Sequence, residues 1–447
     1  MMTPVSAPRR LGAGTSAGYA SGSLVTGAFS TVPGLLLLPY LTDTLGVAAG
    51  VAGVLAFVPK AWAVLLNPVA GRVSDRSTAR IGPRRPFVLG AGLGVGVAFA
   101  LMFAGPFAAA AGAVWALLGY LLTATVFAFF QSPYTAMPAE LTTDPGATTR
   151  LMSWRVAGIA VATLVSGAVA PAVVTAAGGG LPGYRAMGLA VGAIIAVGAV
   201  AAFLGTRRAP QPVADGSPAD RTGLLAQLAV ARADAPLRRL LTVAALQSAA
   251  TGAQLAGVAY LARVVVGDPG VTTTLVVAFT APALVVLPLL MRFGSRVDAR
   301  RGALACSGAS LLVSLGWLAL PVLPAPVVLP VLAVALGSTN ALQDTFVLAI
   351  LSRCIVEGTA RAGQRRAGLY AGLFSAFQGL GFAVGPLLFG LVLQLSGYVS
   401  STTGTAAAQS DATGSGVLLG FAVLPAALTA LSLPALRSPG VTPRPAA

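Results

Sequence analysis

The chain has no histidine and only two cysteines among its 447 residues, which leaves little from which to build an imidazole or thiolate metal site. No loop carries two adjacent acids, and no glycine-rich phosphate-binding motif occurs. The sequence therefore argues against an enzyme. We expect the protein to hold neither a metal ion nor a cofactor.

Charge is also scarce, since 9% of the residues are charged, 12 are acidic, and Lys60 is the single lysine. Apolar runs dominate instead: 56% of the residues are hydrophobic and the mean hydropathy is +0.86. About 20 mostly apolar residues cross a bilayer. The pattern predicts an all-α integral membrane protein with twelve transmembrane helices, at 20–40, 49–70, 87–108, 111–137, 152–177, 185–206, 240–265, 271–291, 303–323, 325–351, 367–396 and 413–436.

The 28 basic residues give a net charge of +16, which on its own suggests nucleic-acid binding. Their placement argues otherwise, because 24 of them lie in the termini or in alternate loops, and the intervening loops hold only Arg185 and Arg263. This asymmetry is the positive-inside pattern. It predicts a multi-pass protein of the plasma (inner) membrane, with both termini in the cytoplasm, the lipid bilayer as partner and no nucleic acid.

The two halves of the chain repeat one loop pattern. Gly71 is followed four positions later by Asp75, Gly294 is followed four positions later by Asp298, and paired arginines come next in both halves. Internal repeats with a substrate path between them are typical of transporters, although the second copy alone also fits an ordinary basic loop. We expect two pseudo-symmetric six-helix bundles and a cytoplasmic linker, at 1–206, 238–447 and 207–237 respectively.

Four sequence blocks carry a family resemblance. They are Tyr40–Gly46 (Y-x-T-D-x-L-G), Asn67–Arg76 (N-P-x-x-G-x-x-S-D-R), Pro133–Thr142 (similar to P-Y-x-A-L-x-P-E-L-T) and Gly363–Tyr370. The loop after Gly71 resembles the signature loop of the major facilitator superfamily. The blocks together resemble its glycoside–pentoside–hexuronide branch of cation symporters, which includes the melibiose carrier. The resemblance implies the major facilitator fold and function as a monomer.

The departures from that branch bear on the coupling ion. Melibiose-type carriers hold the cation and the sugar with acids of the N-terminal half, and those acids fall here at Ala63, Asn67, Gly27 and Gln131. The lysine of the eleventh span falls at Gln378, and Arg155 is the charged position that persists. We therefore expect that sodium is not the coupling ion. A sugar would also lack its usual carboxylate acceptors.

One acid, Asp344, lies well within a predicted span, in the polar patch Thr339–Asp344. Ionisable residues inside a membrane are costly and are functional candidates by default. A carboxylate in a low-dielectric cavity takes up a proton more readily than one in water. We hypothesise that Asp344 carries the coupling proton. The alternative is a span boundary one turn away, or a carboxylate that only pairs with a backbone or arginine group.

Lys60 also lies inside a predicted span. It either joins Arg155 in a cationic pocket for an anionic substrate, pairs with Asp344 across the halves, or snorkels along its helix. Polar amides in the spans are candidates for substrate binding or for interhelical hydrogen bonds, and two aromatic residues are candidates for stacking on a substrate ring or for packing. These residues are Gln131, Asn67, Gln247, Gln254, Asn340, Gln343 and Gln378, with Trp62 and Tyr134.

The repeated loop predicts a gating role. Gly71 permits close packing of the second span, and Asp75 is suited to cap the positive end of a neighbouring helix and to pair with arginine. Such a contact forms when the cytoplasmic side is closed and breaks when it opens. We expect the residues of the repeated loop to hold the cytoplasmic side closed rather than to bind substrate. They are Gly71, Asp75, Arg76, Arg84, Arg85, Gly294, Asp298 and Arg301.

No ATP-binding sequence occurs, so uphill transport must use a gradient. We expect a secondary active transporter that moves a small organic solute, sugar-like or otherwise polar, by alternating access and with proton coupling. One alternative is an exporter of a drug or secondary metabolite that works as an antiporter. Another is a membrane sensor that keeps the fold but does not transport. The sequence blocks favour import, whereas the Ala/Gly/Leu-rich spans favour export or a less polar substrate.

Overall fold

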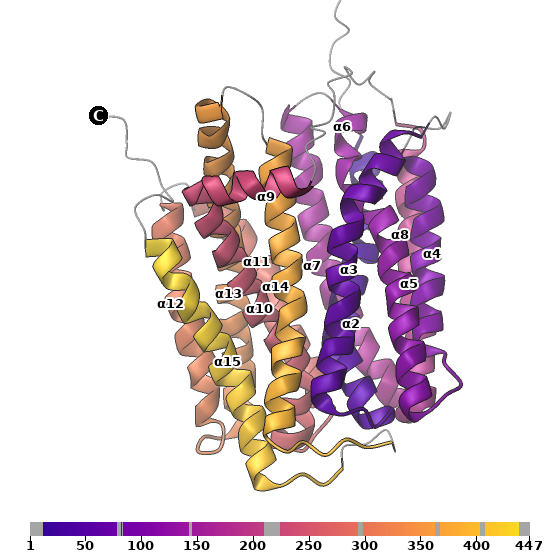
Figure 1. Cartoon of the computed structure of the whole chain (residues 1–447), viewed down its shortest axis with the longest axis vertical. Helices are drawn as coiled ribbons and strands as arrows, with labels where there is room; N and C mark the ends of the chain where they lie inside the picture. Colours follow the sequence, from indigo (N-terminus) through magenta and orange to yellow (C-terminus); the bar gives the residue numbers. More distant parts are fainter. Residues whose placement is uncertain are drawn as a thin grey trace, which may run out of the picture.

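The structure is a computed structural model that describes residues 12–77, 82, 84–142, 145–209, 224–293, 298–362, 367–402 and 407–437. The described part is built from helices and contains no strand (Figure 1). Eleven helical segments in it are long and apolar enough to cross a membrane. The helix at the eighth predicted span has a shorter apolar part, Val271–Val286. The all-α membrane class predicted from the sequence is confirmed.

The first six predicted spans become a bundle of eight α-helices and one π-helical turn, which we call the first bundle. Gly22 separates α1 from α2, and the π-helical turn η1 follows directly on Pro39, which has no backbone N–H to donate within the helix. The elements are α1 (Ala13–Ser21), α2 (Ser23–Pro39), η1 (Tyr40–Thr44), α3 (Ala49–Asp75), α4 (Arg85–Phe103), α5 (Ala109–Ala136), α6 (Pro138–Leu141), α7 (Pro145–Ala176) and α8 (Gly180–Thr206).

The last six predicted spans become the second bundle, which again contains a π-helical turn after its first long helix. The short helix α9 (Leu224–Ala233) lies in the stretch of chain predicted as the linker between the two bundles. The elements of the second bundle are α10 (Ala235–Tyr260), η2 (Leu261–Val266), α11 (Val271–Phe293), α12 (Ala299–Gly316), η4 (Trp317–Ala319), α13 (Ala325–Ala362), α14 (Ala367–Leu395) and α15 (Asp411–Arg437).

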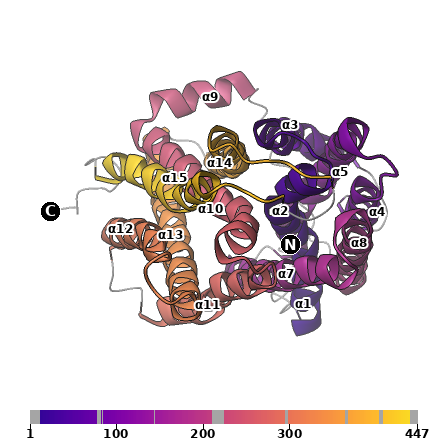
Figure 2. The same ribbon diagram turned by 90° about the horizontal axis from the view of Figure 1, so that it is seen from below.

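The bundles pack side by side and share one internal pattern of contacts. In the first bundle α4 packs on α5 and α8, and in the second bundle α12 packs on α13 and α15. Two seams join the bundles, α3 against α14 and α7 against α11, as the end-on view in Figure 2 shows. At the centre α2 packs on α10. This is the pseudo-symmetric two-bundle architecture expected from the sequence.

The two ends of the molecule differ in charge. We call the end at which α3 ends and α4 and α12 begin the basic end, because Arg76, Arg84, Arg85 and Arg300 lie there. Helix α9 lies across this end, at the top of Figure 1. We call the opposite end, with the turns η1 and η2, the distal end.

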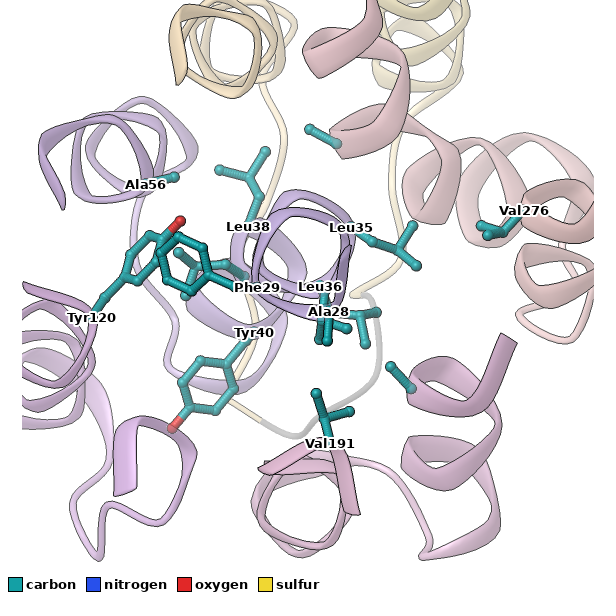
Figure 3. Close-up of a cluster of buried hydrophobic side chains, with 14 of the residues drawn as sticks. Ala28, Phe29, Leu35, Leu36, Leu38, Tyr40, Ala56, Tyr120, Val191 and Val276 are labelled. Atoms are coloured by element: carbon teal, nitrogen blue, oxygen red, sulfur yellow. The ribbon is translucent and has the colours of Figure 1, made fainter. Parts of the chain in front are cut away.

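Helix α2 forms the centre of the core, and nearly every residue of it is buried. Because it is apolar all round, it must contact other helices on every side. Figure 3 shows Phe29 beside Tyr120 of α5, with ring centroids 6.0 Å apart, and Leu35 pointing toward Val276 of α11. The central helix of the first bundle is thus held by residues of both bundles.

Candidate functional site

The two faces of α3 are distinct. Large apolar residues at Val58, Trp62, Leu65 and Val69 are exposed at helical spacing, which is typical of a face toward lipid. Trp62 belongs to this face, and its indole N–H donates to Thr125 Oγ1 of α5 at 3.0 Å. This position favours packing at the helix surface over stacking on a substrate.

Lys60 and Asn67 lie on the other face of α3, seven residues apart and therefore one above the other. Asn67 is exposed on this face, which points away from the apolar stripe. The Lys60 Nζ atom is enclosed and has no hydrogen-bond partner in the described part of the chain. It lies 4.3 Å from the ring centroid of Phe382 on α14, a cation–π contact across the seam between the bundles.

Asp344 lies near the middle of α13. Its side chain is exposed, and the residue lies far from both ends of the helix. Within the described residues it forms no ion pair, so Lys60 and Asp344 are not partners in this conformation. The preceding Gln343 is buried, and its Oε1 atom has no hydrogen-bond partner among the described residues.

Two buried amides of α10 form hydrogen bonds to side chains of neighbouring helices. Gln254 Nε2 donates to Ser314 Oγ of α12 at 3.2 Å, and Gln254 Oε1 accepts a hydrogen bond of 3.4 Å from Asn340 of α13. Two helical turns away, Gln247 Nε2 donates to Ser307 Oγ and Ser432 Oγ at 3.1 and 3.2 Å. These bonds support the interhelical interpretation for Asn340, Gln247 and Gln254.

Arg155 of α7 belongs to a cluster on the helices of the first bundle. Its guanidinium lies 5.6 Å from the ring centroid of Tyr134 of α5, and its Nε atom is buried without a hydrogen-bond partner in the described residues. The Tyr134 side chain is fully buried, and its hydroxyl donates to the carbonyl of Tyr19 at 2.7 Å. Nearby, Gln131 Oε1 accepts a hydrogen bond of 2.8 Å from Thr26.

The predicted pathway residues lie in two separate places. Arg155, Tyr134 and Gln131 lie among helices of the first bundle, where Tyr134 and Gln131 hold α5 to α1 and α2, whereas Lys60 lies at the seam with the second bundle. No contact in the described part joins Arg155 to Lys60. Gln378 lies half-buried on α14. Its neighbour Gly379 approaches Val64 of α3.

The residues predicted to gate the basic end make contacts within their own bundles where the structure describes them. Gly71 approaches Ser132 of α5, because a Cβ added at Gly71 would lie 3.0 Å from the Ser132 Oγ atom. Arg84 Nη1 donates to the carbonyl of Ala136 at 2.6 Å, and Arg76 is exposed at the end of α3. Gly294 and the side chain of Asp75 lie outside the described residues.

Arg85 and Arg300 occupy equivalent places at the starts of α4 and α12. Arg85 is buried and donates to the carbonyls of Arg207 and Ala209 at 2.9 and 2.8 Å, where α8 ends. Arg300 donates to the carbonyl of Leu436 at 2.8 Å and to that of Arg437, where α15 ends. Each guanidinium therefore caps the negative end of the last helix of its bundle.

Asp298 caps the helix that follows it. One carboxylate oxygen accepts hydrogen bonds of 3.1 Å from the backbone N–H groups of Arg300 and Arg301, and the other pairs with Arg353 of α13 at 3.1 Å. The backbone bond from Arg301, followed by the bond from Arg353, lowers the pKa of the Asp298 carboxyl below its ordinary value. All these partners belong to the second bundle.

Sequence reasoning did not single out Asp43 and Arg263. In the structure they form a buried ion pair of 2.7 Å between η1 and η2, with Asp43 1% exposed. Both lie at the ends of predicted spans, where a charged residue is ordinary. A signal did exist, since Tyr-Leu-x-Asp at Tyr40 and Tyr-Leu-x-Arg at Tyr260 occupy matching places in the two halves.

Comparisons with known proteins agree with this architecture. The model of the family described as MFS/sugar transport protein matches residues 18–437. The glucuronide carrier protein homolog of Escherichia coli is 27% identical over 88% of this chain and 85% of its own length. Two further E. coli relatives match over shorter stretches: YagG is 34% identical over 35% of this chain, and the inner membrane symporter YicJ is 30% identical over 27%. These two matches span 34% and 26% of the relatives' own lengths.

A solved structure resembles the fold over most of its length. The crystal structure of a bacterial homolog to the human lysosomal transporter Spinster, in an inward-facing and unoccupied conformation, superposes with a TM-score of 0.69. The match covers 94% of each chain at 15% sequence identity. At that identity the likeness shows a common fold.

Proposed function

The chain belongs to the family of MFS/sugar transport proteins, and on that premise we propose that it moves a small polar organic solute across the plasma membrane by alternating access. Family membership makes it a membrane transporter and not an enzyme. Because no ATP-binding sequence occurs, the transport is secondary and draws on an ion gradient. It works as a monomer, with the substrate path between the two bundles.

The basic end faces the cytoplasm under this proposal, because positively charged loops stay inside. Hydrogen bonds and the Asp43–Arg263 ion pair join the bundles at the distal end. Asn67 and Asp344, by contrast, are exposed nearer the middle of their helices. These observations support an inward-facing conformation. The loop from Gly71 to Arg85 and the capping carboxylate of Asp298 then control the opening and closing of the basic end.

Proton coupling through Asp344 is supported by the position of that carboxylate, the observation that carries the proposal. It is an exposed acid near the middle of a membrane-length helix, and no basic side chain of the described part forms an ion pair with it. An acid in such a place exchanges a proton each time its surroundings change from wet to dry. Sodium is not the coupling ion, because Ala63 and Asn67 stand where the branch has its cation-binding acids.

The substrate carries a negative charge under this proposal. Lys60 is a cation near the middle of its span whose counter-charge is not supplied by the described residues, and a buried cation is stabilised when an anion binds beside it. The name of the glucuronide carrier protein homolog describes a sugar acid as cargo. We therefore assign the substrate to the sugar acids and their glycosides, with the carboxylate at Lys60.

Proteoliposomes test the coupling. With an imposed pH gradient, acid outside, the wild-type protein is expected to accumulate a labelled glucuronide above its equilibrium level. Asp344→Asn cannot exchange a proton at this site and is expected to abolish accumulation while leaving solute counterflow within about twofold. Both fluxes are measured on the same preparation.

The matched control is Asp268→Asn, which removes an exposed acid at the distal end, between η2 and α11, and is expected to leave accumulation unchanged. Absence of any glucuronide flux under the pH gradient would contradict the proposed transport of this substrate class. Wild-type accumulation by Asp344→Asn would refute the role of Asp344. Uptake that requires sodium would refute the interpretation of Ala63 and Asn67.

A further inference from the structure

The distal end contains a buried charge pair that connects the two bundles. Arg263 Nη1 donates to Asp43 Oδ2 at 2.7 Å, and the two side chains are 16% and 1% exposed. The other carboxylate oxygen of Asp43 accepts hydrogen bonds from Tyr398 at 2.7 Å and from Thr42 at 2.8 Å. The carboxylate thus receives donors from both bundles.

Further hydrogen bonds enclose this pair. The hydroxyls of Thr42 and Tyr260 lie 2.7 Å apart, and the backbone N–H of Ser401 donates to the carbonyl of Thr42 at 2.9 Å. Ser400 donates to the carbonyl of Val47 at 2.7 Å. The turn η1 of the first bundle is therefore bound to η2 and to the segment after α14, both of the second bundle.

The two charges occupy equivalent positions of the internal repeat. Tyr40-Leu41-Thr42-Asp43 and Tyr260-Leu261-Ala262-Arg263 lie 220 residues apart, each within or beside a π-helical turn that ends the first long helix of its bundle. Glycines with positive φ follow both turns, Gly46 at 69° and Gly267 at 82°. The repeat has therefore kept one geometry and placed opposite charges in it.

We infer that Asp43 and Arg263 form a lock on the pseudo-twofold axis, which holds the distal end closed in the inward-facing state and opens in the outward-facing state. The inference rests on the proposed alternating-access function. Two groups on the axis separate as soon as either bundle tilts, because each belongs to a different bundle. Buried ionic groups within a membrane are stable while paired, and separation requires that water reach both.

Water has a route to the lock from the distal side. A cavity of about 400 Å³ is lined by Arg263 together with Gln409, Asp411 and Ser415. When the pair separates, the guanidinium can therefore be hydrated at once instead of crossing a dry state. The closed arrangement is favoured by the ion pair, and the open one by hydration, which gives the lock two stable states.

Distances between spin labels test the lock without reading transport. The labels are placed on Ala177→Cys and Val322→Cys, exposed distal positions of the first and second bundles, after replacement of Cys306 and Cys354 by alanine. In lipid nanodiscs, Asp43→Asn and Arg263→Gln are each expected to raise the ratio of distal-open to distal-closed populations about tenfold. The charge-swapped pair Asp43→Arg with Arg263→Asp is expected to restore most of the closed population.

The matched control is Asp268→Asn, which removes another distal acid, and it should leave the ratio unchanged. Among the described residues, the Asp268 carboxylate accepts one hydrogen bond, a local one from the backbone N–H of Gly270. Parent-like ratios in both single variants would overturn the lock. If the swapped pair does not fold, the neutral pair Asp43→Asn with Arg263→Gln decides: a ratio like that of the singles supports the lock, and a parent-like ratio refutes it. Parent-like label distances in the variants, together with normal glucuronide uptake by the wild-type protein, would refute the lock alone. A shifted ratio in the variants, with no glucuronide uptake by the wild-type protein, would refute the proposed transport alone.

Discussion

Lys60 combines a structural cost with a proposed binding role, and the two can be separated. Replacement by methionine removes an enclosed ammonium that has no hydrogen-bond partner in the described residues, while a side chain of similar length remains against Phe382. We expect the thermal unfolding midpoint of Lys60→Met without ligand to rise, since an uncompensated buried charge is lost. Its affinity for a glucuronide should fall about tenfold to a hundredfold, as for a lost charged hydrogen bond.

The control ligand for this variant is the matching neutral glucoside, titrated calorimetrically beside the glucuronide. Lys60→Met should bind the glucoside as the parent does, because only the carboxylate is proposed to contact Lys60. An equal loss of affinity for both ligands would show that the substitution disturbs the site as a whole. A lower unfolding midpoint without ligand would show that the ammonium has a stabilising partner.

Candidate functional residues could be predicted from the sequence where a charged side chain interrupts an apolar run. Asp344 and Lys60 could be chosen from the sequence because a charge inside an apolar run is costly whatever surrounds it. The face on which a residue lies was harder to foresee, so Trp62 and Asn67 on one helix could not be assigned to opposite faces before the apolar stripe was seen. Asp43 required knowledge of a partner 220 residues away.

Among the helices, α8 and α15 end in the same way, and each end depends on an arginine from a neighbouring helix. Arg85→Gln leaves two carbonyls at the end of α8, one part-buried and one buried, without their charged donor. We expect this to cost about 2–4 kcal/mol, since charged hydrogen bonds contribute about 1.5–3 kcal/mol each and are partly replaced by water. Arg300 is less buried than Arg85, so Arg300→Gln should reduce the stability by a smaller amount. Both losses of stability are measured by thermal unfolding in detergent.

Two matched variants decide whether capping of the α8 end requires the planar, two-pronged guanidinium group of Arg85 or only its positive charge. Arg85→Lys keeps the charge but cannot reach both carbonyls with one planar group, and it should recover less than half of the loss. Arg207→Gln removes an exposed basic side chain at the same helix end while its carbonyl still accepts from Arg85, and it should behave as the parent. Full rescue by lysine would mean that the helix end needs a positive charge and not a fork.

Elements followed from the sequence where apolar runs were long. Each of the twelve predicted spans corresponds in order to a helical part of the described chain, and eleven of these parts are long and apolar enough to cross a membrane. The eighth, in α11, has a shorter apolar part, Val271–Val286. The π-helical turns η1 and η2 were not predicted, since apolar periodicity does not distinguish them from a helix end. They matter because they bring Asp43 and Arg263 into contact.

At the scale of the whole molecule, the bundles are held together by two kinds of contact. Polar contacts join them at the distal end, among them the Asp43–Arg263 pair, which separates reversibly under the proposed lock. The seam between α3 and α14 instead depends on small residues, which allow close approach of the two backbones. Tilting one bundle on the other requires both kinds of contact to separate at the distal end while the basic end closes.

The seam makes the last prediction, on Gly390 of α14. A Cβ at this position would lie 2.6 Å from the carbonyl oxygen of Ala49 and 3.1 Å from the Cα atom of Gly53. Because both obstacles are backbone, Gly390→Ala must push α14 away from α3 at the distal end. Overlap of this kind costs about 1–3 kcal/mol, so the distal-open population, read from the Ala177–Val322 label pair, should rise about tenfold. Gly372→Ala on the same helix has nothing within 4 Å of its added Cβ and should leave that population unchanged. Equal populations in the two variants would mean that the bundles do not pivot at this seam.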